Sequence, residues 1–139
     1  MRYRKFDDTY AVRIDKGEEI TAKLKELCLA ENIRFAQVSA IGASEFALLG
    51  VYNLETQKYA EEPFSHFCEI AGLTGNITTV DGQPYTHLHA TLADPRHNLH
   101  AGHVLALTVG ATCEMFVRVF DSEVGRVHDD QLGINLWDI

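Results

Sequence analysis

Three histidines in the middle of the chain have the spacing of a metal site. His87 and His89 are one residue apart, so on an extended strand both imidazoles lie on the same face. His103 begins the next apolar stretch, and if Leu92 pairs near His100 in an antiparallel hairpin, His89 lies opposite His103. Three neutral imidazoles, with a fourth position left to water or substrate, are typical of an open tetrahedral zinc site. The sequence therefore predicts a divalent metal, zinc, at His87, His89 and His103.

The same residues also have a plainer interpretation. Histidines that alternate along a strand can form a polar face in water, and His97 and His100 lie in a polar stretch that is typical of a loop. The convergence of a third histidine favours the metal interpretation. Because a ligand imidazole must be neutral, we expect metal binding to weaken below the ordinary histidine pKa of about 6.5.

The elements that would position these histidines begin with a strand and a helix. The strand is predicted over residues 10–14, and apolar residues at helical spacing predict one helix from about residue 16 to Glu31. Asp15, followed three residues later by Glu18, resembles a capping box and predicts where this helix begins.

Strand patterns account for most of the remaining chain. Asp81-Gly82 is a strong hairpin signal, and the last long run is apolar on both strand faces, so that it must be covered on both sides. One helix cannot cover so much sheet, which predicts that the chain associates with itself. The predicted strands cover residues 35–41, 45–53, a short stretch from 59, then 63–71, 72–80, 84–92 and 103–120.

Length and composition indicate one globular domain. With 139 residues, 46% of them apolar, we expect a single domain over 1–139, with its core at about 8–120 and a C-terminal tail at 121–139. The lone Trp137 in this tail is expected to pack on the body of the protein or on a neighbour. No apolar run approaches the roughly 20 residues that span a bilayer, and the first residues lack the apolar stretch of a signal peptide.

The cysteines and the charge bear on location and partners. Cys28, Cys68 and Cys113 lie among apolar residues without C-x-x-C spacing, which predicts buried thiols in a reducing compartment and hence a cytoplasmic protein without a membrane partner. The formal net charge is −8, which disfavours DNA as a partner and leaves at most weak, salt-sensitive binding. The only basic cluster, within residues 2–5, is expected to be a frayed terminus.

Six stretches together carry a resemblance to a known family. They are, in chain order, Val38–Ala43, Phe67–Ile77, Asp81–Pro84, His87–His89, Gly102–His103 and Ala111–Glu114. Their order and spacing resemble those of the plants and prokaryotes conserved (PPC) domain family over about residues 8–120. One departure is Ala101, where the family tends to have a second glycine, and another is Phe67-Cys68, where plant members have a Gly-Arg-Phe run. The resemblance implies an α+β fold, a mostly antiparallel sheet with one main helix packed on it, assembled as a homotrimer with a metal at the three histidines.

The functional label of this family is DNA binding, which in plant members rests largely on an AT-hook. This chain has no such Arg-Gly-Arg-Pro segment and resembles the prokaryotic type. The resemblance therefore implies a DNA-binding or regulatory protein with a three-histidine metal site, which could also bind a small-molecule ligand. The DNA-binding part is an analogy of fold rather than of site.

The fold also resembles that of acetolactate decarboxylase, which uses His-x-His and a later histidine on zinc. This similarity keeps a second interpretation open, a metal-dependent lyase or hydrolase acting on a small carbonyl or carboxylate substrate, because zinc with an open position can polarise a carbonyl or activate water. Glu69 and Glu114 are the candidate catalytic residues, as acid/base groups or as acceptors for an imidazole N–H. Both could instead be salt-bridged or solvent-facing, and Arg118 could neutralise Glu114.

Overall fold

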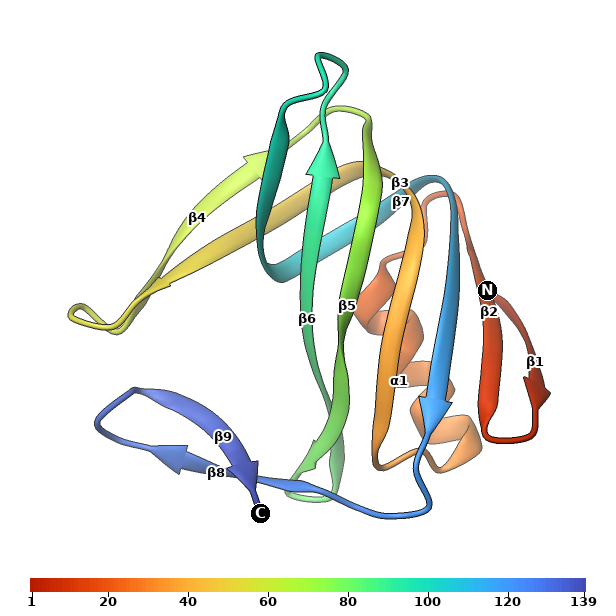
Figure 1. Cartoon of the computed structure of the whole chain (residues 1–139), viewed down its shortest axis with the longest axis vertical. Coiled ribbons are helices and arrows are strands. Elements are labelled where there is room, and N and C mark those ends of the chain that lie inside the picture. Colours follow the sequence, from red (N-terminus) through yellow and green to blue (C-terminus); the bar gives the residue numbers. More distant parts are fainter.

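The computed structural model describes all 139 residues as one helix and nine strands (Figure 1). Seven strands form one antiparallel sheet in the order β1-β2-β7-β6-β5-β3-β4, and the last two form a separate hairpin. The predicted α+β class, mostly antiparallel sheet with a single helix, is confirmed. The elements are β1 (Arg2–Phe6), β2 (Thr9–Asp15), α1 (Ile20–Glu31), β3 (Ala36–Asn53), β4 (Lys58–Phe64), β5 (Cys68–Val80), β6 (Gln83–Ala93), β7 (Leu99–Val119), β8 (Gly125–Asp129) and β9 (Ile134–Asp138).

Two long strands, β3 and β7, organise the sheet. They pair with each other over most of their length, from Ala36 opposite Val119 to Gly50 opposite His103. The first half of β3 also pairs with β5, and the first residues of β7 also pair with β6. Because β5 pairs with β6 as well, β3, β5, β6 and β7 close into a ring of hydrogen-bonded neighbours. This closure brings the histidines of β6 against the start of β7.

Register shifts bend the two long strands where they cross. The β3–β7 register slips on both sides of Ser44, just after Gly42. A Cβ atom at Gly42 would lie 2.3 Å from the carbonyl oxygen of Thr112, and one at Gly110 would lie 2.7 Å from the carbonyl carbon of Ser44, so a side chain at either position would collide with backbone. The two strands predicted on either side of this point are therefore one bent strand.

Helix α1 begins later than predicted. Glu19 is its N-cap, and the side chain of Glu19 accepts a hydrogen bond from the Ala22 N–H. The Glu18 carboxylate does accept from the Asp15 N–H, as in a capping box, but this bond closes a turn ahead of the helix. Asn32 ends the helix in the left-handed conformation, with φ of 52°, close to the predicted end. No helix in this structure has the length and apolar character needed to cross a membrane.

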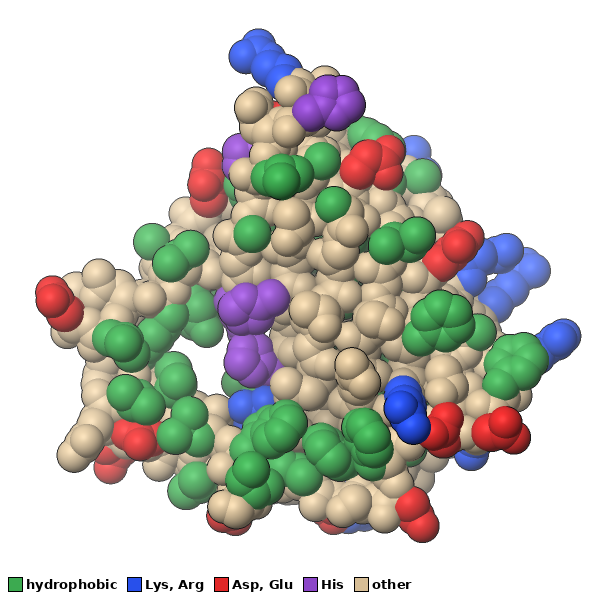
Figure 2. Space-filling view, in the orientation of Figure 1, with side chains coloured by type: hydrophobic (Ala, Val, Ile, Leu, Met, Phe, Trp, Pro, Cys, Tyr) green, Lys and Arg blue, Asp and Glu red, His purple; other side chains and the backbone are tan.

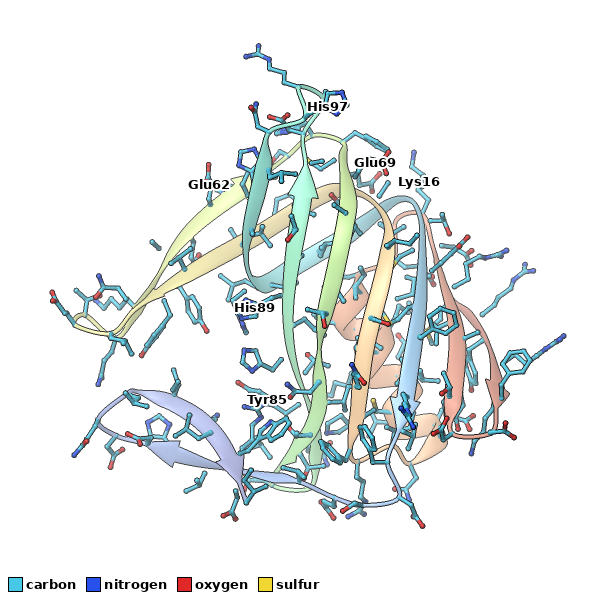
Figure 3. All side chains as sticks on the ribbon, viewed as in Figure 1. Lys16, Glu62, Glu69, Tyr85, His89 and His97 are labelled. Carbon is cyan, nitrogen blue, oxygen red and sulfur yellow. The ribbon has the colours of Figure 1, made fainter.

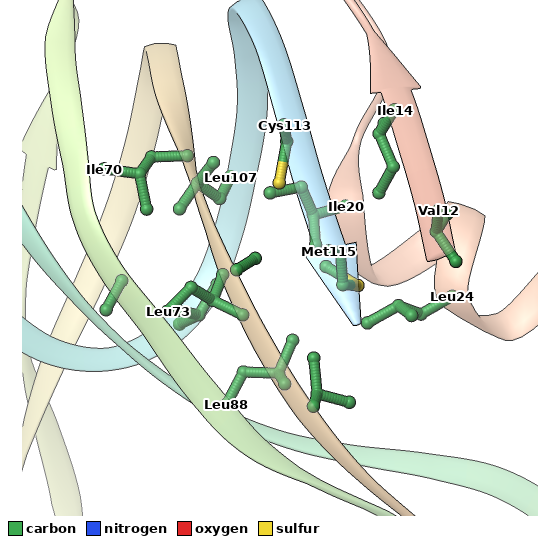
Figure 4. Packing of buried hydrophobic residues seen from close by; sticks show 14 of the residues in the cluster. Val12, Ile14, Ile20, Leu24, Ile70, Leu73, Leu88, Leu107, Cys113 and Met115 are labelled. Carbon is green, nitrogen blue, oxygen red and sulfur yellow. The ribbon is translucent and has the colours of Figure 1, made fainter. Parts of the chain in front are cut away.

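The hydrophobic core lies between α1 and the sheet (Figure 4). It is one cluster of 27 buried residues, to which the helix contributes its apolar stripe of Ile20, Leu24, Leu27 and Cys28. All three cysteines are buried and free, as predicted. The crossing strands contribute Leu73, Leu88 and Leu107 among others.

Both ends of the chain are better ordered than the sequence suggested. Strand β1 pairs with β2 along its whole length, so the prediction of a frayed basic terminus is wrong. At the other end, β8 and β9 form a hairpin where only a tail with few signals was recognised. The ring of Trp137 packs edge-on against Phe35, with ring centroids 5.7 Å apart, which places it on the body of the protein.

We expect substitutions of a buried and of an exposed leucine in α1 to have very different effects on the free energy of unfolding. Leu24 is fully buried, so Leu24→Ala should lower the free energy of unfolding by about 2–5 kcal/mol through lost burial and a residual cavity. Leu29 is 57% exposed on the same helix, so Leu29→Ala should change it by about 0.5 kcal/mol or less. Urea denaturation of both variants tests this, and equal losses would contradict the placement of the core.

Candidate metal site

The three predicted histidines meet because of strand parity and register. His87 and His89 lie on one face of β6, and His89 pairs directly with His103 at the start of β7. Leu92 pairs with His100 in the same hairpin, so the predicted register is confirmed. The ring centroids of the three histidines lie 5.2–5.4 Å apart.

The geometry of the three rings suits one metal ion. One ring nitrogen from each histidine lies within 4.8 Å of the other two. Tetrahedral zinc has Zn–N distances of about 2.0–2.1 Å, which place two ligand nitrogens about 3.3 Å apart, so small rotations of the side chains would complete the site. His87 and His103 are half-buried, and His89 is exposed. The Nδ1 atom of His103 is buried without any hydrogen-bond partner, and coordination through this nitrogen would satisfy it.

Neighbouring residues hold the rings in place. The Tyr59 ring stacks on the imidazole of His103, with centroids 5.1 Å apart and planes 23° apart. Gly75 of β5 lies opposite Leu88, between the two histidines of β6. A Cβ atom at Gly75 would lie 2.0 Å from the carbonyl oxygen of His87, so only glycine lets β5 approach the histidine strand this closely.

The surroundings favour neutral imidazoles. Burial, together with the neighbouring His87 and His89, lowers the pKa of His103 to about 4. Burial also lowers the pKa of His87, with smaller contributions from Arg126 and His89. A neutral imidazole is the form that binds metal, so both histidines can coordinate below the pH of about 6.5 expected from the sequence, and His103 down to a pH of about 4.

The site opens into a cavity of about 590 Å³ between the main sheet and the C-terminal hairpin. Figure 2 shows an opening through the molecule here, with histidine side chains at its edge. The Tyr52 hydroxyl donates to the backbone oxygens of Leu132 and Gly133 and so ties the β3–β4 arm to the β8–β9 hairpin around this space. Besides the histidines of the site, its polar lining comes from Tyr52, Tyr59, Tyr85, Arg126, His128 and Asn135.

The structure does not bring the two candidate glutamates to this cavity. Glu69 and Glu114 are both exposed and line a shallow depression on the outer face of the sheet. Figure 3 shows Glu69 toward the opposite end of β5 from Tyr85, with His89 at an intermediate height. His97 lies in the β6–β7 turn, and His100 lies in β7 beside Asp94, 3.5 Å from its carboxylate, rather than in the predicted loop.

Two residues near the metal site were not singled out from the sequence. Tyr85 precedes His87 by two residues on the same face of β6, so strand parity would have found it. Arg126 comes from β8, and its guanidinium carbon lies 4.5 Å from the centroid of the Tyr85 ring. No sequence pattern signals Arg126, because it reaches the cavity only through tertiary contacts.

Comparisons with known proteins bear on the family and the fold. The profile of the Plants and Prokaryotes Conserved domain matches residues 1–121, and the chain belongs to this family. A candidate DNA-binding protein from Bacteroides thetaiotaomicron has a similar structure, with a TM-score of 0.95 and 31% identity over 99% of this chain and 96% of that one. A metal-containing protein from Archaeoglobus fulgidus has a TM-score of 0.88 and 30% identity over 99% of both chains.

A more distant structure shares only the fold. It is a Staphylococcus aureus protein of unknown function described as similar to alpha-acetolactate decarboxylase, with a TM-score of 0.56 and 18% identity over 88% of this chain and 56% of that one. This confirms the resemblance of fold noted from the sequence. None of the curated proteins matches the chain.

The low pKa of His103 predicts how the stability of the metal-free protein depends on pH. Between about 6.5, the value for an unfolded histidine, and about 4, the unfolded chain binds a proton at this position that the folded chain does not. The free energy of unfolding should therefore fall as the pH falls through this window. His103→Gln should flatten the dependence, whereas His97→Gln, in an exposed turn, should leave it unchanged. Urea titrations at stepped pH test this, and an unchanged slope in His103→Gln would contradict it.

Proposed function

We propose that this protein binds a divalent metal ion, zinc, through His87, His89 and His103, and uses the open coordination position to bind a small molecule. The observation that carries the proposal is the convergence of three imidazoles at the wall of a cavity. Two of them have a lowered pKa, and one has a buried nitrogen without a hydrogen-bond partner. The size of the cavity, about 590 Å³, is in the range of small-molecule sites. The name of the Archaeoglobus relative, a metal-containing protein, supports it.

A metal-dependent enzyme is the second candidate. No carboxylate lines the cavity, so neither Glu69 nor Glu114 is placed there to act as an acid or base. Glu114 does share a separate depression with His89 on the outer face of the sheet. Two tyrosines favour this candidate nonetheless, because Tyr59 and Tyr85 line the cavity and burial raises the pKa of Tyr59, which keeps its hydroxyl protonated as a proton donor. A lyase or hydrolase would then rely on the metal to polarise a carbonyl.

DNA binding remains a weaker alternative. It is suggested by the name of the Bacteroides relative and by three arginines on the β1–β2 hairpin, Arg2, Arg4 and Arg13, which line one shallow depression. Arg13 is already paired with Asp15, and the net charge of −8 opposes a phosphate backbone. The metal cavity therefore supports a small-molecule function better than a nucleic-acid one.

The metal assignment predicts that replacing one of the three histidines removes the zinc but leaves the fold intact. His89→Ala removes an exposed ligand at no cost to the core, so the purified variant should lose stoichiometric zinc while its melting temperature without metal stays close to that of the metal-free parent. His97→Ala, which removes an exposed histidine in the β6–β7 turn, is the matched control and should retain zinc. Elemental analysis of the parent and of both variants gives the measurement. Full zinc retention in His89→Ala would contradict the assignment.

We further propose that the chain assembles as a homotrimer in the cytoplasm, using the sheet face that α1 leaves uncovered. On this face Ile41 and Phe116 are each 61% exposed and line the same depressions, with Phe67 next to Ile41. Figure 2 views this side and shows hydrophobic side chains spread over it. Leu107 lies in the long apolar run that led us to expect self-association, where it was a possible interface position. It is fully buried within its own subunit and is therefore core instead.

The assembly can be tested at the exposed face. Light scattering should give the parent protein a mass near three times the 15.6 kDa of one chain, and Phe116→Asp should lower it by placing a charge in the apolar contact. Leu29→Asp, an equally exposed apolar position on the helix side, should keep the parental mass. A parental mass near 15.6 kDa would refute the assembly.

A further inference from the structure

Arg126 is the one lysine or arginine that lines the metal cavity, and neutral groups alone hold it there. Its Nε atom donates to the hydroxyl of Thr78, Nη1 to the backbone oxygen of Asn135, and Nη2 to the side-chain oxygen of Asn76, each at 2.8 Å. A guanidinium has five N–H donors, so two remain, one on each terminal nitrogen. The side chain is half-buried and forms no salt bridge.

The cavity therefore contains positive charge without compensation. None of its lining residues is Asp or Glu, and a divalent ion on three neutral imidazoles would add two further charges. A partly buried cation without a counter-ion is unfavourable, and an anion that enters the cavity relieves this cost. Three other arginines, Arg13, Arg34 and Arg118, have carboxylate partners, and the remaining three are exposed to solvent.

The spacing between the guanidinium and the metal site sets the size of such an anion. Arg126 lies over the ring of Tyr85, with 4.5 Å between its guanidinium carbon and the ring centroid. Tyr85 and His87 are successive residues on one face of β6, and such residues are about 7 Å apart. A ligand of a few carbon atoms spans this distance, with an oxygen on the metal at one end and a carboxylate at the other.

We propose that Arg126 and the metal form a two-point site for a small organic anion, whose carboxylate pairs with the two free N–H groups while its other end supplies an oxygen ligand to the metal. This inference rests on the metal site proposed above and names the class of molecule it accepts. Arg126 confers specificity for the charge at the far end of the ligand. The paired donors of a guanidinium match the two oxygens of a carboxylate, which gives both affinity and orientation.

A purely structural role for Arg126 predicts a different behaviour. Its bonds join β8 to Asn76 and Thr78 of β5 and so help to hold the hairpin over the cavity. If that were its whole role, replacing it would displace the hairpin and weaken every ligand to the same extent. A site for an anion instead loses only the ligands that carry the charge, so probes that differ in that charge alone separate the two roles.

The experiment uses the full-length protein loaded with Co²⁺, whose absorption spectrum reports a new ligand on the metal. Three hydroxamates serve as probes: the monohydroxamate of succinic acid, the same molecule with its carboxylate replaced by an amide, and acetohydroxamate. In the parent, the carboxylate probe should bind about tenfold or more tightly than its amide. In Arg126→Met this preference should disappear, while the affinities for Co²⁺, the amide and acetohydroxamate stay within about twofold. Arg96→Met removes an exposed arginine of the β6–β7 turn and should keep the preference.

Three results would overturn the inference in distinguishable ways. Equal binding of the carboxylate and amide probes to the parent would refute the anion site while leaving the metal site intact. Uniform weakening of all three probes in Arg126→Met would assign the residue a structural role only. A parent protein whose spectrum does not respond to acetohydroxamate would refute the open metal position itself, and with it the proposed function.

Discussion

The pairing of β3 with β7 is the constraint on which the rest of the structure depends. These strands are 18 and 21 residues long, far beyond an ordinary strand. They remain hydrogen-bonded through a bend at which only glycine fits at positions 42 and 110. The bend lets β7 pair with β6 at one end and with β2 at the other. The sheet therefore folds back on itself, encloses the apolar face under α1, and carries His103 to its place opposite His89. Loss of this bend would separate His103 from His87 and His89 without changing any of the three histidines.

The chemistry of the site follows from partial burial. Desolvation favours the neutral form of an imidazole, which lowers the pKa of His87 and His103 and suits them to metal rather than to protons. The same surroundings disfavour an unpaired guanidinium, yet Arg126 is kept there by bonds to neutral acceptors. The lowered pKa values of His87 and His103 and the unpaired guanidinium of Arg126 are the basis of our proposal that the site receives a metal and then an anion. Membership of the Plants and Prokaryotes Conserved domain family is compatible with this chemistry, because a fold shared within a family does not fix what each site binds.

The C-terminal hairpin forms one wall of the cavity into which the three histidines point. Strands β8 and β9 lie across from the β3–β4 arm, where Tyr52 and Gln57 donate hydrogen bonds to backbone oxygens between the two hairpin strands. Trp137 anchors the hairpin against Phe35. The family profile covers residues 1–121, so the segment that supplies Arg126 lies outside it. The part of the chain within the profile thus contains the three histidines, while the C-terminal hairpin supplies the group that we propose to select the small molecule.

The sequence by itself determined the features that depend on neighbours in the chain. Strand parity placed His87 and His89 on one face, the Asp81-Gly82 turn fixed the start of their strand, and helical spacing identified the buried face of α1. Tertiary structure alone decided that Glu69 and Glu114 lie away from the metal cavity, that Leu107 is core rather than interface, and that Arg126 approaches residues 50 positions earlier in the chain. The physical reason is that side-chain direction along a strand alternates with a fixed local period. Burial, pKa and charge pairing instead depend on which distant strands share a face, and no local pattern encodes that.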